Sequence, residues 1–267
     1  MAGAGARRAR KAPRDQGAAG RRRGGSVDPD EIARFAAMAE EWWDPRGKFM
    51  PLHKLNPVRL AFIRDRVAAH FGRDPLAERP LDQLRLVDVG SGGGLLAEPM
   101  ARLGARVTGI DAAEPNVRTA GRHAAEGGLD IDYRYMTAEA LAAAGERFDV
   151  VLNMEVVEHV ADLGGFLDAC CTLVRPGGVM VTATLNRTVK AFVLAIVGAE
   201  YLLRWLPVGS HRWSKFVRPS ELAAGLRAGG LDMVELTGVA YNPICDRWHL
   251  APRDLGVNYM AFAAKPE

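Results

Sequence analysis

Two acids and a histidine form a compact cluster in the sequence. Glu155, Glu158 and His159 come directly after residues 148–153, an apolar segment typical of a buried β-strand. If a helical turn starts there, the three side chains stand at i, i+3 and i+4 and share one face. Two carboxylates and an imidazole suit a hard or borderline divalent cation. They also suit a histidine general base without a metal, or a structural hydrogen-bond network.

A glycine-rich turn precedes this cluster. The run Asp88-Val89-Gly90-Ser91-Gly92 is followed by two more glycines, which let the backbone turn sharply and let a ligand approach closely. In a doubly wound sheet, ligands bind outside the carboxyl ends of the strands. We therefore expect Gly90 and Gly92 to bind a cofactor. Asp111 ends the next predicted strand, where a carboxylate can accept both hydroxyls of a ribose.

The details of this turn favour one cofactor over another. A dinucleotide fingerprint needs a third glycine where Leu95 stands, and the turn has no basic residue to hold a pyrophosphate. The acid at Asp88 suits a cofactor with a cationic end, and S-adenosylmethionine has one in its sulfonium and amino groups. The turn therefore predicts binding of S-adenosylmethionine. The alternatives are NAD and a tight turn that binds no ligand.

The elements that must position these residues alternate along the chain from residue 84. The predicted strands, separated in the first part by helical segments, are 84–89, 106–110, 131–135, 148–153, 179–184, 231–240 and 257–264. Strands and helices at this spacing form βαβ units with right-handed crossovers, which predicts a doubly wound α/β sheet. The long non-helical connection between the last two strands predicts an antiparallel hairpin.

Three further regions surround or interrupt the sheet domain, which we place at residues 81–267. Residues 1–26 are predicted to be a disordered basic tail, and residues 27–80 an N-terminal helical cap with helices over about 28–41 and 56–71. An insertion at about 187–218 interrupts the alternation of strands and helices.

Charge is unevenly distributed between the tail and the rest of the chain. The 267 residues carry a formal charge of +3, with +7 on residues 1–25 and therefore −4 on the remainder. The tail has no apolar segment typical of a secretory signal. It could hold anionic lipid or RNA weakly, but it has no aromatic residue on which bases could stack, so we expect no nucleic-acid partner. The 3 cysteines cannot form a disulfide framework and fit a reducing compartment.

The segment 189–206 in the insertion is unusually apolar. Only residues 191–199 are free of charge, which is too short to span a bilayer of about 30 Å. On an α-helix, Lys190, Glu200 and Arg204 fall within one sector of roughly 80°. This pattern predicts a helix lying in a membrane interface or a lid over an apolar tunnel, the alternative being an internal helix with a narrow solvent stripe.

Longer motifs resemble a known family. The glycine turn with residues 109–111, 149–151 and 173–178 resembles the motifs of class I methyltransferases, whose Rossmann-like sheet has seven strands, the last one antiparallel. Further motifs, which run from about residue 27 to 262, look like the ubiquinone-biosynthesis O-methyltransferase family: Trp42-Trp43-Asp44, Pro51-Leu52-His53, Leu55-Asn56-Pro57-Val58-Arg59, Thr184-Leu185-Asn186-Arg187, Tyr241-Asn242-Pro243 and Val257-Asn258-Tyr259-Met260.

The resemblance assigns roles to several residues. It implies cofactor contacts at Arg59, Gly90, Asp111 and Met154, and Mg²⁺ or a similar ion at the acid–histidine cluster. Without it, Arg59 would be interpreted as a charge on a helix surface and Met154 as core packing. His53 lies in a family motif and is a candidate for the acceptor pocket.

The resemblance also implies the reaction. The enzyme would transfer a methyl group from S-adenosylmethionine to catechol-type hydroxyls of polyprenylated ubiquinone precursors, in both O-methylation steps (a polyprenyl hydroxyphenol and a demethylubiquinol). A metal that chelates both catechol oxygens would lower the hydroxyl pKa and fix its orientation. We expect a cytoplasmic protein at the inner membrane surface (the matrix side in a mitochondrion), with other ubiquinone-biosynthesis enzymes as candidate partners. The alternative is a methyltransferase for another small molecule.

Overall fold

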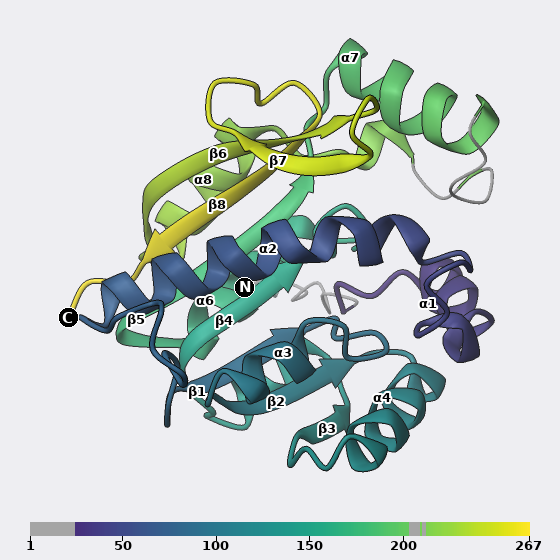
Figure 1. Ribbon diagram of the computed structural model, residues 1–267. Helices are drawn as coiled ribbons and strands as arrows, with labels where there is room; N and C mark the ends of the chain where they lie inside the picture. Colours follow the sequence, from purple (N-terminus) through teal and green to yellow (C-terminus); the bar gives the residue numbers. More distant parts are fainter. Residues whose placement is uncertain (1–24, 203–208, 210–211) are drawn as a thin grey trace, which may run out of the picture.

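One twisted sheet with helices on both faces organises the chain (Figure 1). The computed structural model describes residues 25–202, 209 and 212–267. The strand order is β3-β2-β1-β4-β5-β8-β6-β7, parallel from β3 to β5 and antiparallel from β5 to β7. The strands are β1 Arg85–Val89, β2 Arg106–Asp111, β3 Asp132–Tyr135, β4 Phe148–Met154, β5 Val174–Leu185, β6 Asp232–Asn242, β7 Arg247–Ala251 and β8 Asn258–Ala264.

The strand order reverses between β1 and β4. Val89 near the end of β1 lies opposite Ile110 of β2 on one side and opposite Asn153 of β4 on the other. At such a topological switch point the loops after the strands diverge and leave a crevice. The glycine turn after β1 and the acid–histidine cluster after β4 therefore meet at this crevice.

The doubly wound α/β prediction is confirmed, and the predicted strands are all present together with one more. The additional strand, β7, pairs antiparallel with the end of β6 at the edge of the sheet. It lies within the non-helical connection between the last two predicted strands, which pair antiparallel with each other as predicted. Trp248 and Leu250 alternate along β7 and pack against the apolar cluster that also includes α2. This packing stabilises a strand that is too short to be recognised from its sequence.

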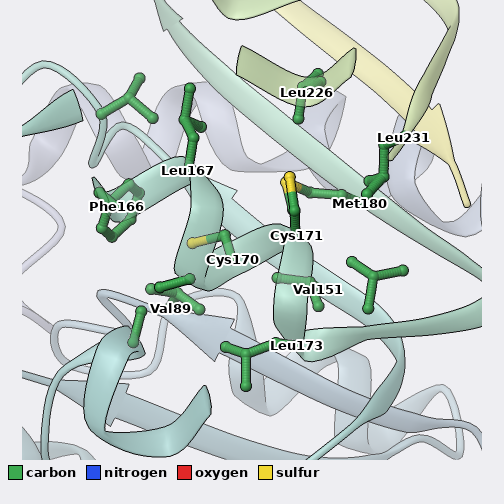
Figure 2. Close-up of a cluster of buried hydrophobic side chains, with 14 of the residues drawn as sticks. Val89, Val151, Phe166, Leu167, Cys170, Cys171, Leu173, Met180, Leu226 and Leu231 are labelled. Atoms are coloured by element: carbon green, nitrogen blue, oxygen red, sulfur yellow. The ribbon is translucent and has the colours of Figure 1, made fainter. Parts of the chain in front are cut away.

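Helices cover both faces of the sheet and bury two apolar clusters. Along β4, Val151 joins the cluster shown in Figure 2, whereas Val150 and Leu152 join the cluster on the opposite face. This alternation is expected of a parallel strand buried on both sides. The connecting helices are α3 Ala97–Arg102, α4 Glu114–Glu126, α5 Ala138–Ala143, α6 Leu163–Leu173 and α8 Pro219–Ala228.

The predicted N-terminal cap is helical, with different bounds. Helix α1 (Pro29–Ala36) begins after Asp28, whose side chain accepts a hydrogen bond from the backbone N–H of Asp30, and a 3₁₀ turn, η1 (Ala39–Glu41), follows. Helix α2 (Met50–His70) begins six residues earlier than expected and contains Pro57. A proline inside a helix removes one backbone hydrogen bond, and the burial of Phe62, Ile63 and Val67 against the sheet compensates for that loss.

The apolar insertion is helical, but it is not an α-helix. A turn, α7 (Val189–Ala191), continues as a π-helix, η2 (Phe192–Leu202). Its i→i+5 hydrogen bonds change the angular spacing of the side chains, so the predicted polar sector does not form. Lys190 is exposed, Glu200 is buried at 1% exposure, and Arg204 lies outside the described residues. No helix in the described ranges is long and apolar enough to cross a bilayer.

The boundary of the basic tail also differs slightly from the prediction. Residues 1–24 lie outside the described residues. Ser26, which we assigned to the tail, is buried, its N–H donates to Oε1 of Glu139 at 3.2 Å, and its carbonyl accepts from the N–H of Ala161 at 2.6 Å. The folded part of the chain therefore already includes Ser26.

Candidate active site

A cavity of about 720 Å³ lies at the carboxyl ends of the parallel strands. Its walls come from the glycine turn, the cap, the loop after β4, the insertion and the β6–β7 hairpin. It includes seven of the predicted site residues and candidates, and these seven are Arg59, Gly90, Gly92, Asp111, Met154, Glu155 and His159. Glu158 and His53 are not among the residues that line it.

The glycine turn is shaped by positive backbone angles and close contacts. Gly90 has φ of 72° and Gly92 has φ of 53°, a region that side chains other than glycine rarely adopt. A Cβ on Gly90 would lie 2.6 Å from Val156, and one on Gly92 would lie 2.4 Å from Trp42. The predicted need for glycine at these two positions therefore has a direct steric cause.

Asp111 is fixed at the end of β2 by three hydrogen bonds. Its Oδ2 accepts from the N–H of Gly92 at 2.9 Å, and its Oδ1 accepts from the N–H of Ala113 at 2.7 Å and from Nδ2 of Asn116 at 3.2 Å. Burial raises the pKa of this carboxyl, and the three donors counteract the rise. The arrangement presents a carboxylate to the cavity at the position predicted for ribose binding.

Asp88 lies behind the turn and does not line the cavity. It is 2% exposed, and its Oδ2 has no hydrogen-bond partner among the described residues. Burial and then the charge of Asp111 raise its pKa to about 7. Asp88 therefore does not face the cofactor cavity, in contrast to the role predicted for it.

Arg59 is buried rather than exposed on the surface of α2. Its side chain is 5% exposed, and Nη2 lies 2.9 Å from Oε1 of Glu155 in an ion pair. Nε and Nη2 have no acceptor in hydrogen-bond geometry within the described part of the chain. A buried guanidinium with donors left over fits an additional anionic partner, such as the carboxylate of S-adenosylmethionine. Met154, buried at the end of β4, lines the same cavity.

The acid–histidine cluster does not form the predicted helical face. Glu155 has φ of 59°, and its N–H donates to the carbonyl of Ala183 at 2.8 Å. The chain then makes a tight turn, closed by the N–H of His159 donating to the carbonyl of Val156 at 2.9 Å. The left-handed conformation of Glu155 directs its own side chain toward the cavity, whereas the side chain of Glu158 points into the protein.

Glu158 is 3% exposed and its Oε2 accepts from Oγ1 of Thr184 at 2.7 Å. Burial and then the charge of Glu155 raise the pKa of Glu158 well above its usual range. The carboxyl therefore lies beneath the floor of the cavity, between Thr184 of β5 and the carboxyl of Glu155.

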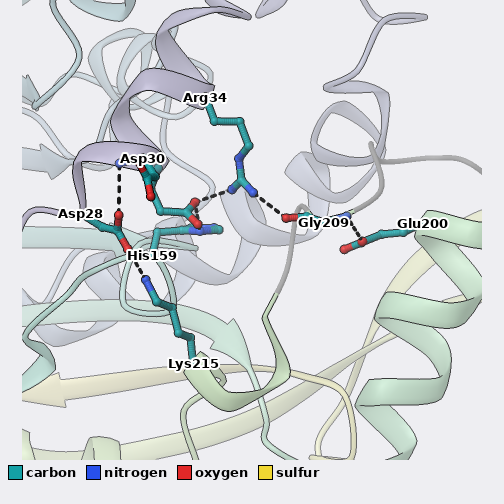
Figure 3. A network of polar contacts seen from close by, with 8 residues as sticks. Asp28, Asp30, Arg34, His159, Glu200, Gly209 and Lys215 are labelled. Atoms are coloured by element: carbon teal, nitrogen blue, oxygen red, sulfur yellow. Dashed lines mark hydrogen bonds and ion pairs between the residues drawn. The ribbon is translucent and has the colours of Figure 1, made fainter.

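His159 is held by the N-terminal cap. Its Nδ1 lies 3.0 Å from Oε2 of Glu31, and the ring of Phe35 meets the imidazole edge-on at 5.2 Å between centroids. Burial would raise the pKa of Glu31, but His159, Arg34 and Lys215 outweigh it and lower the pKa. Figure 3 shows His159 within this polar network, which extends through Arg34 to the insertion.

The three residues predicted as metal ligands do not fit a cation in this arrangement. Glu155 pairs with Arg59, Glu158 with Thr184 and His159 with Glu31. Within the described ranges, no three His, Cys, Asp or Glu side chains lie close enough together to hold a metal ion.

Several site residues were missed or misplaced by sequence reasoning. Neither Glu31 nor Asn116 was identified as a candidate site residue. Trp42 was noted only as part of a family motif, with no role assigned, and the structure shows that it lines the cavity. His53 supports it from outside the cavity, because its Nε2 lies 2.9 Å from the carbonyl oxygen of Trp42.

Comparisons with known proteins agree with this geometry. Residues 87–182 match a family model described as a methyltransferase domain. A "ubiquinone biosynthesis O-methyltransferase" of Parvibaculum lavamentivorans is 62% identical over 240 residues, 90% of this chain and 94% of that protein. Another, from a Chelativorans species, is 59% identical over 241 residues, 90% of this chain and 95% of that protein.

Solved structures show the same fold at low identity. The magnesium protoporphyrin IX methyltransferase of Synechocystis with bound SAM has a TM-score of 0.57 and 14% identity, covering 91% of this chain and 100% of that chain. A Burkholderia thailandensis N1-methyltransferase with bound S-adenosylhomocysteine has a TM-score of 0.56 and 19% identity, covering 91% and 93%. These likenesses show a Rossmann-like methyltransferase sheet.

Proposed function

The chain belongs to the ubiquinone biosynthesis O-methyltransferase family and is an S-adenosylmethionine-dependent O-methyltransferase. We propose that its acceptor is a catechol-type hydroxyl on a polyprenylated ubiquinone precursor, in both O-methylation steps. One observation supports this most strongly. A single cavity joins the glycine turn and Asp111 to Glu155, His159 and an apolar wall.

The cofactor end of the cavity uses residues with distinct chemistry. Asp111 accepts hydrogen bonds from the ribose hydroxyls, the donors of Arg59 bind the carboxylate, and Met154 lines the adenine. S-adenosylmethionine, when bound, supplies a methyl group on a sulfonium. The polar groups of the protein at this end are fixed before binding by the hydrogen bonds described above, which limits the cost of ordering them.

At the acceptor end, His159 acts as the general base. A phenolic hydroxyl must lose its proton as its oxygen forms the new bond to the methyl carbon and the carbon–sulfur bond breaks. His159 takes this proton, and Glu31 orients the imidazole through its Nδ1. Glu155 orients the acceptor and balances the charge of Arg59, while Glu158 supports the floor of the site through Thr184.

Magnesium remains a separate prediction. A cation at this cluster would require Glu155 to leave Arg59 and Glu158 to leave Thr184. We therefore assign no step of the reaction to a metal.

The insertion supports a proposal of peripheral membrane association. Val189, Phe192, Val193 and Leu194 are exposed apolar side chains, and Leu194 also lines the cavity. A polyprenyl chain could pass from a bilayer surface along these residues into the site. The proposal requires no contact with other ubiquinone-biosynthesis enzymes, which remain candidate partners.

The acceptor class can be tested with two substrates. Purified protein and methyl-labelled S-adenosylmethionine are incubated with a catechol that carries a polyprenyl chain or with the same catechol lacking it. We expect the polyprenyl compound to have a value of kcat/KM at least roughly tenfold higher, since burial of each CH₂ group contributes about 0.8 kcal/mol. Equal values would show that the enzyme acts on another class of small molecule.

A further inference from the structure

The tandem tryptophans of the cap lie directly on the glycine turn. The indole ring of Trp42 occupies the space in which a Cβ on Gly92 would have to fit, and a Cβ on Gly93 would lie 2.3 Å from Cβ of Trp42. Trp43 binds the same turn, because its Nε1 donates to the carbonyl of Gly93 at 2.8 Å. The cap is thus in contact with the cofactor loop over consecutive residues.

The position of Trp42 is fixed from the cap side. Its ring stacks on Phe49 with 3.8 Å between centroids and 8° between planes, and its carbonyl lies 2.9 Å from Nε2 of His53. Trp42 is 8% exposed and packs with Leu95 at the end of the glycine-rich segment. A movement of the cap away from the sheet would therefore remove this ring from the turn.

A chain of hydrogen bonds links the indole to the ribose-binding carboxylate. Nε1 of Trp42 donates to Oδ1 of Asn116 at 3.0 Å, and Nδ2 of Asn116 donates to Oδ1 of Asp111 at 3.2 Å. An indole can only donate and a carboxylate can only accept, so these two neighbours fix the orientation of the amide. Oδ2 of Asp111 accepts from the N–H of Gly92, which closes the chain beneath the Trp42 ring.

Asn116 is the central member of this chain. It is 1% exposed, so a lost partner would not be replaced by bulk water. Its donation is one of the interactions that lower the pKa of Asp111 against the effect of burial. Removal of the indole N–H would free the amide to rotate and would weaken the alignment of the carboxylate.

The cap also forms part of the acceptor end of the cavity. Phe35, Met38 and Leu52 line the same cavity as Trp42 and Asp111. A ligand that stabilises the docked position of Trp42 therefore stabilises the wall against which the acceptor binds. By linkage, two ligands that favour one conformation increase each other's affinity.

We propose that Trp42 and Asn116 are positioning residues that couple binding of the cofactor to docking of the N-terminal cap. This inference rests on the proposed function, since it takes S-adenosylmethionine as the ligand of Asp111. Cofactor binding stabilises the existing arrangement of the carboxylate, Asn116 and Trp42, and the docked cap completes the acceptor site. Cofactor and acceptor consequently bind cooperatively.

The first experiment measures the Kd of S-adenosylhomocysteine by calorimetry. Trp42→Phe retains an aromatic ring and removes the N–H, and Asn116→Ala removes the amide. We expect each to raise the Kd roughly tenfold, the effect of losing about 1.4 kcal/mol of binding energy. The double variant should bind no more weakly than Asn116→Ala alone, because both changes break the same chain. Trp213→Phe, a matched change in a half-exposed tryptophan that does not line the cavity, should leave the Kd unchanged.

The second experiment uses the wild-type protein and does not depend on the stability of variants. Hydrogen exchange of residues 29–56 is measured with and without S-adenosylhomocysteine. We expect the ligand to slow exchange in this segment, and we expect a smaller change in Trp42→Phe. If wild type binds the ligand with no change in exchange across the cap, the coupling is wrong. If wild type does not bind it at all, the proposed function itself fails.

Discussion

Glu31 and His159 are separated by 128 positions in the sequence, yet Oε2 of Glu31 lies 3.0 Å from Nδ1 of His159. The first helix of the cap thereby contacts the loop after β4 at the floor of the cavity. Because the pKa of Glu31 is lowered by His159, Arg34 and Lys215 despite its burial, the acid is a carboxylate at neutral pH. It accepts the Nδ1–H of the imidazole and thus selects the tautomer and orientation of the ring.

Replacement of Glu31 by Gln should impair the chemical step more than binding. The amide still fills the space but lacks the charge that orients the imidazole. We expect kcat to fall roughly tenfold or more, within the range attributed to general base catalysis, while the Kd of S-adenosylhomocysteine stays unchanged. Steady-state kinetics and calorimetry measure the two quantities. Asp30→Asn, an exposed acid in the same helical turn, is the control. A Glu31→Gln enzyme with wild-type kcat would exclude the positioning role.

The raised pKa of Asp88 predicts an unusual dependence of stability on pH. Burial and Asp111 raise this pKa from 3.8 to about 7, so the folded chain binds the proton more tightly than the unfolded chain. The contribution of Asp88 to stability is therefore complete below about pH 4 and is lost as the pH rises through about 7. In this window, the free energy of unfolding should fall by up to about 1.4 kcal/mol per pH unit from this group.

Asp88→Asn should remove that dependence, because an amide does not titrate. This dependence is measured by urea unfolding of the ligand-free protein at pH 5, 6, 7 and 8, in steps of about one pH unit through the window and just above it. We expect the variant to gain stability relative to wild type as the pH rises. Asp130→Asn, at an exposed acid, should show no such trend. A constant difference between Asp88→Asn and wild type over the whole range would mean that Asp88 is ionised throughout.

Glu158→Gln separates a structural role from a metal-binding role. The amide oxygen can still accept the hydrogen bond of Thr184, and the substituted side chain carries no charge in its buried position. We expect the variant to retain activity within about threefold, which corresponds to less than 1 kcal/mol. If Glu158 binds an essential cation, the same variant should lose activity, and EDTA should abolish activity of the wild type.

Thr184→Val provides the complementary change beneath the site. It deletes the hydroxyl that donates to Glu158 while nearly preserving volume. An unsatisfied buried acceptor costs about 1–3 kcal/mol, so we expect the free energy of unfolding to decrease by that amount. Denaturant unfolding measures it, and a stability equal to that of the wild type would contradict the assigned contact.

A charge on the exposed apolar part of the insertion should weaken membrane binding. Val193 is 48% exposed, so Val193→Glu places a carboxylate at the surface without opening the core. We expect the fraction of protein that co-sediments with anionic vesicles to fall severalfold. Leu76→Glu is the matched control, because Leu76 is 81% exposed and lies outside the insertion and the cavity. Equal losses in both variants would refute a specific role of the insertion.

The sheet and its cofactor end could be predicted from the sequence because the relevant signals are local. Short apolar segments that end in Asp88 and Asp111 mark the strands, and glycines mark the turn. Parallel connectivity then places the carboxyl ends of the strands at one edge. The positions of Gly90, Gly92 and Asp111 follow from these few rules.

The acid–histidine cluster could not be predicted in detail because one residue leaves the expected backbone region. Spacing of i, i+3 and i+4 implies a shared face only in a helix, and Glu155 adopts φ of 59°. A glutamate at this position does not by itself indicate a left-handed backbone conformation. As a result Glu155 lines the cavity, whereas Glu158 lies buried beneath it, although the two carboxyls remain neighbours.

Long-range partners were also inaccessible to local patterns. Trp42 and Asn116 are 74 positions apart, and Lys54 of α2 binds Asp246 of the β6–β7 turn 192 positions away. Such pairs depend on how the cap docks on the sheet, which hydrophobic periodicity does not specify. The same reason explains why β7 was missed.

The most direct test of the proposed active site is a single-turnover assay of methyl transfer from labelled S-adenosylmethionine to a polyprenyl catechol, with wild type and His159→Ala compared at saturating cofactor. We predict a methyl ether product with wild type and a rate at least about 100-fold lower with His159→Ala, the contribution expected of a general base. A wild-type enzyme that forms no methyl ether, or a His159→Ala enzyme as fast as wild type, would contradict the account.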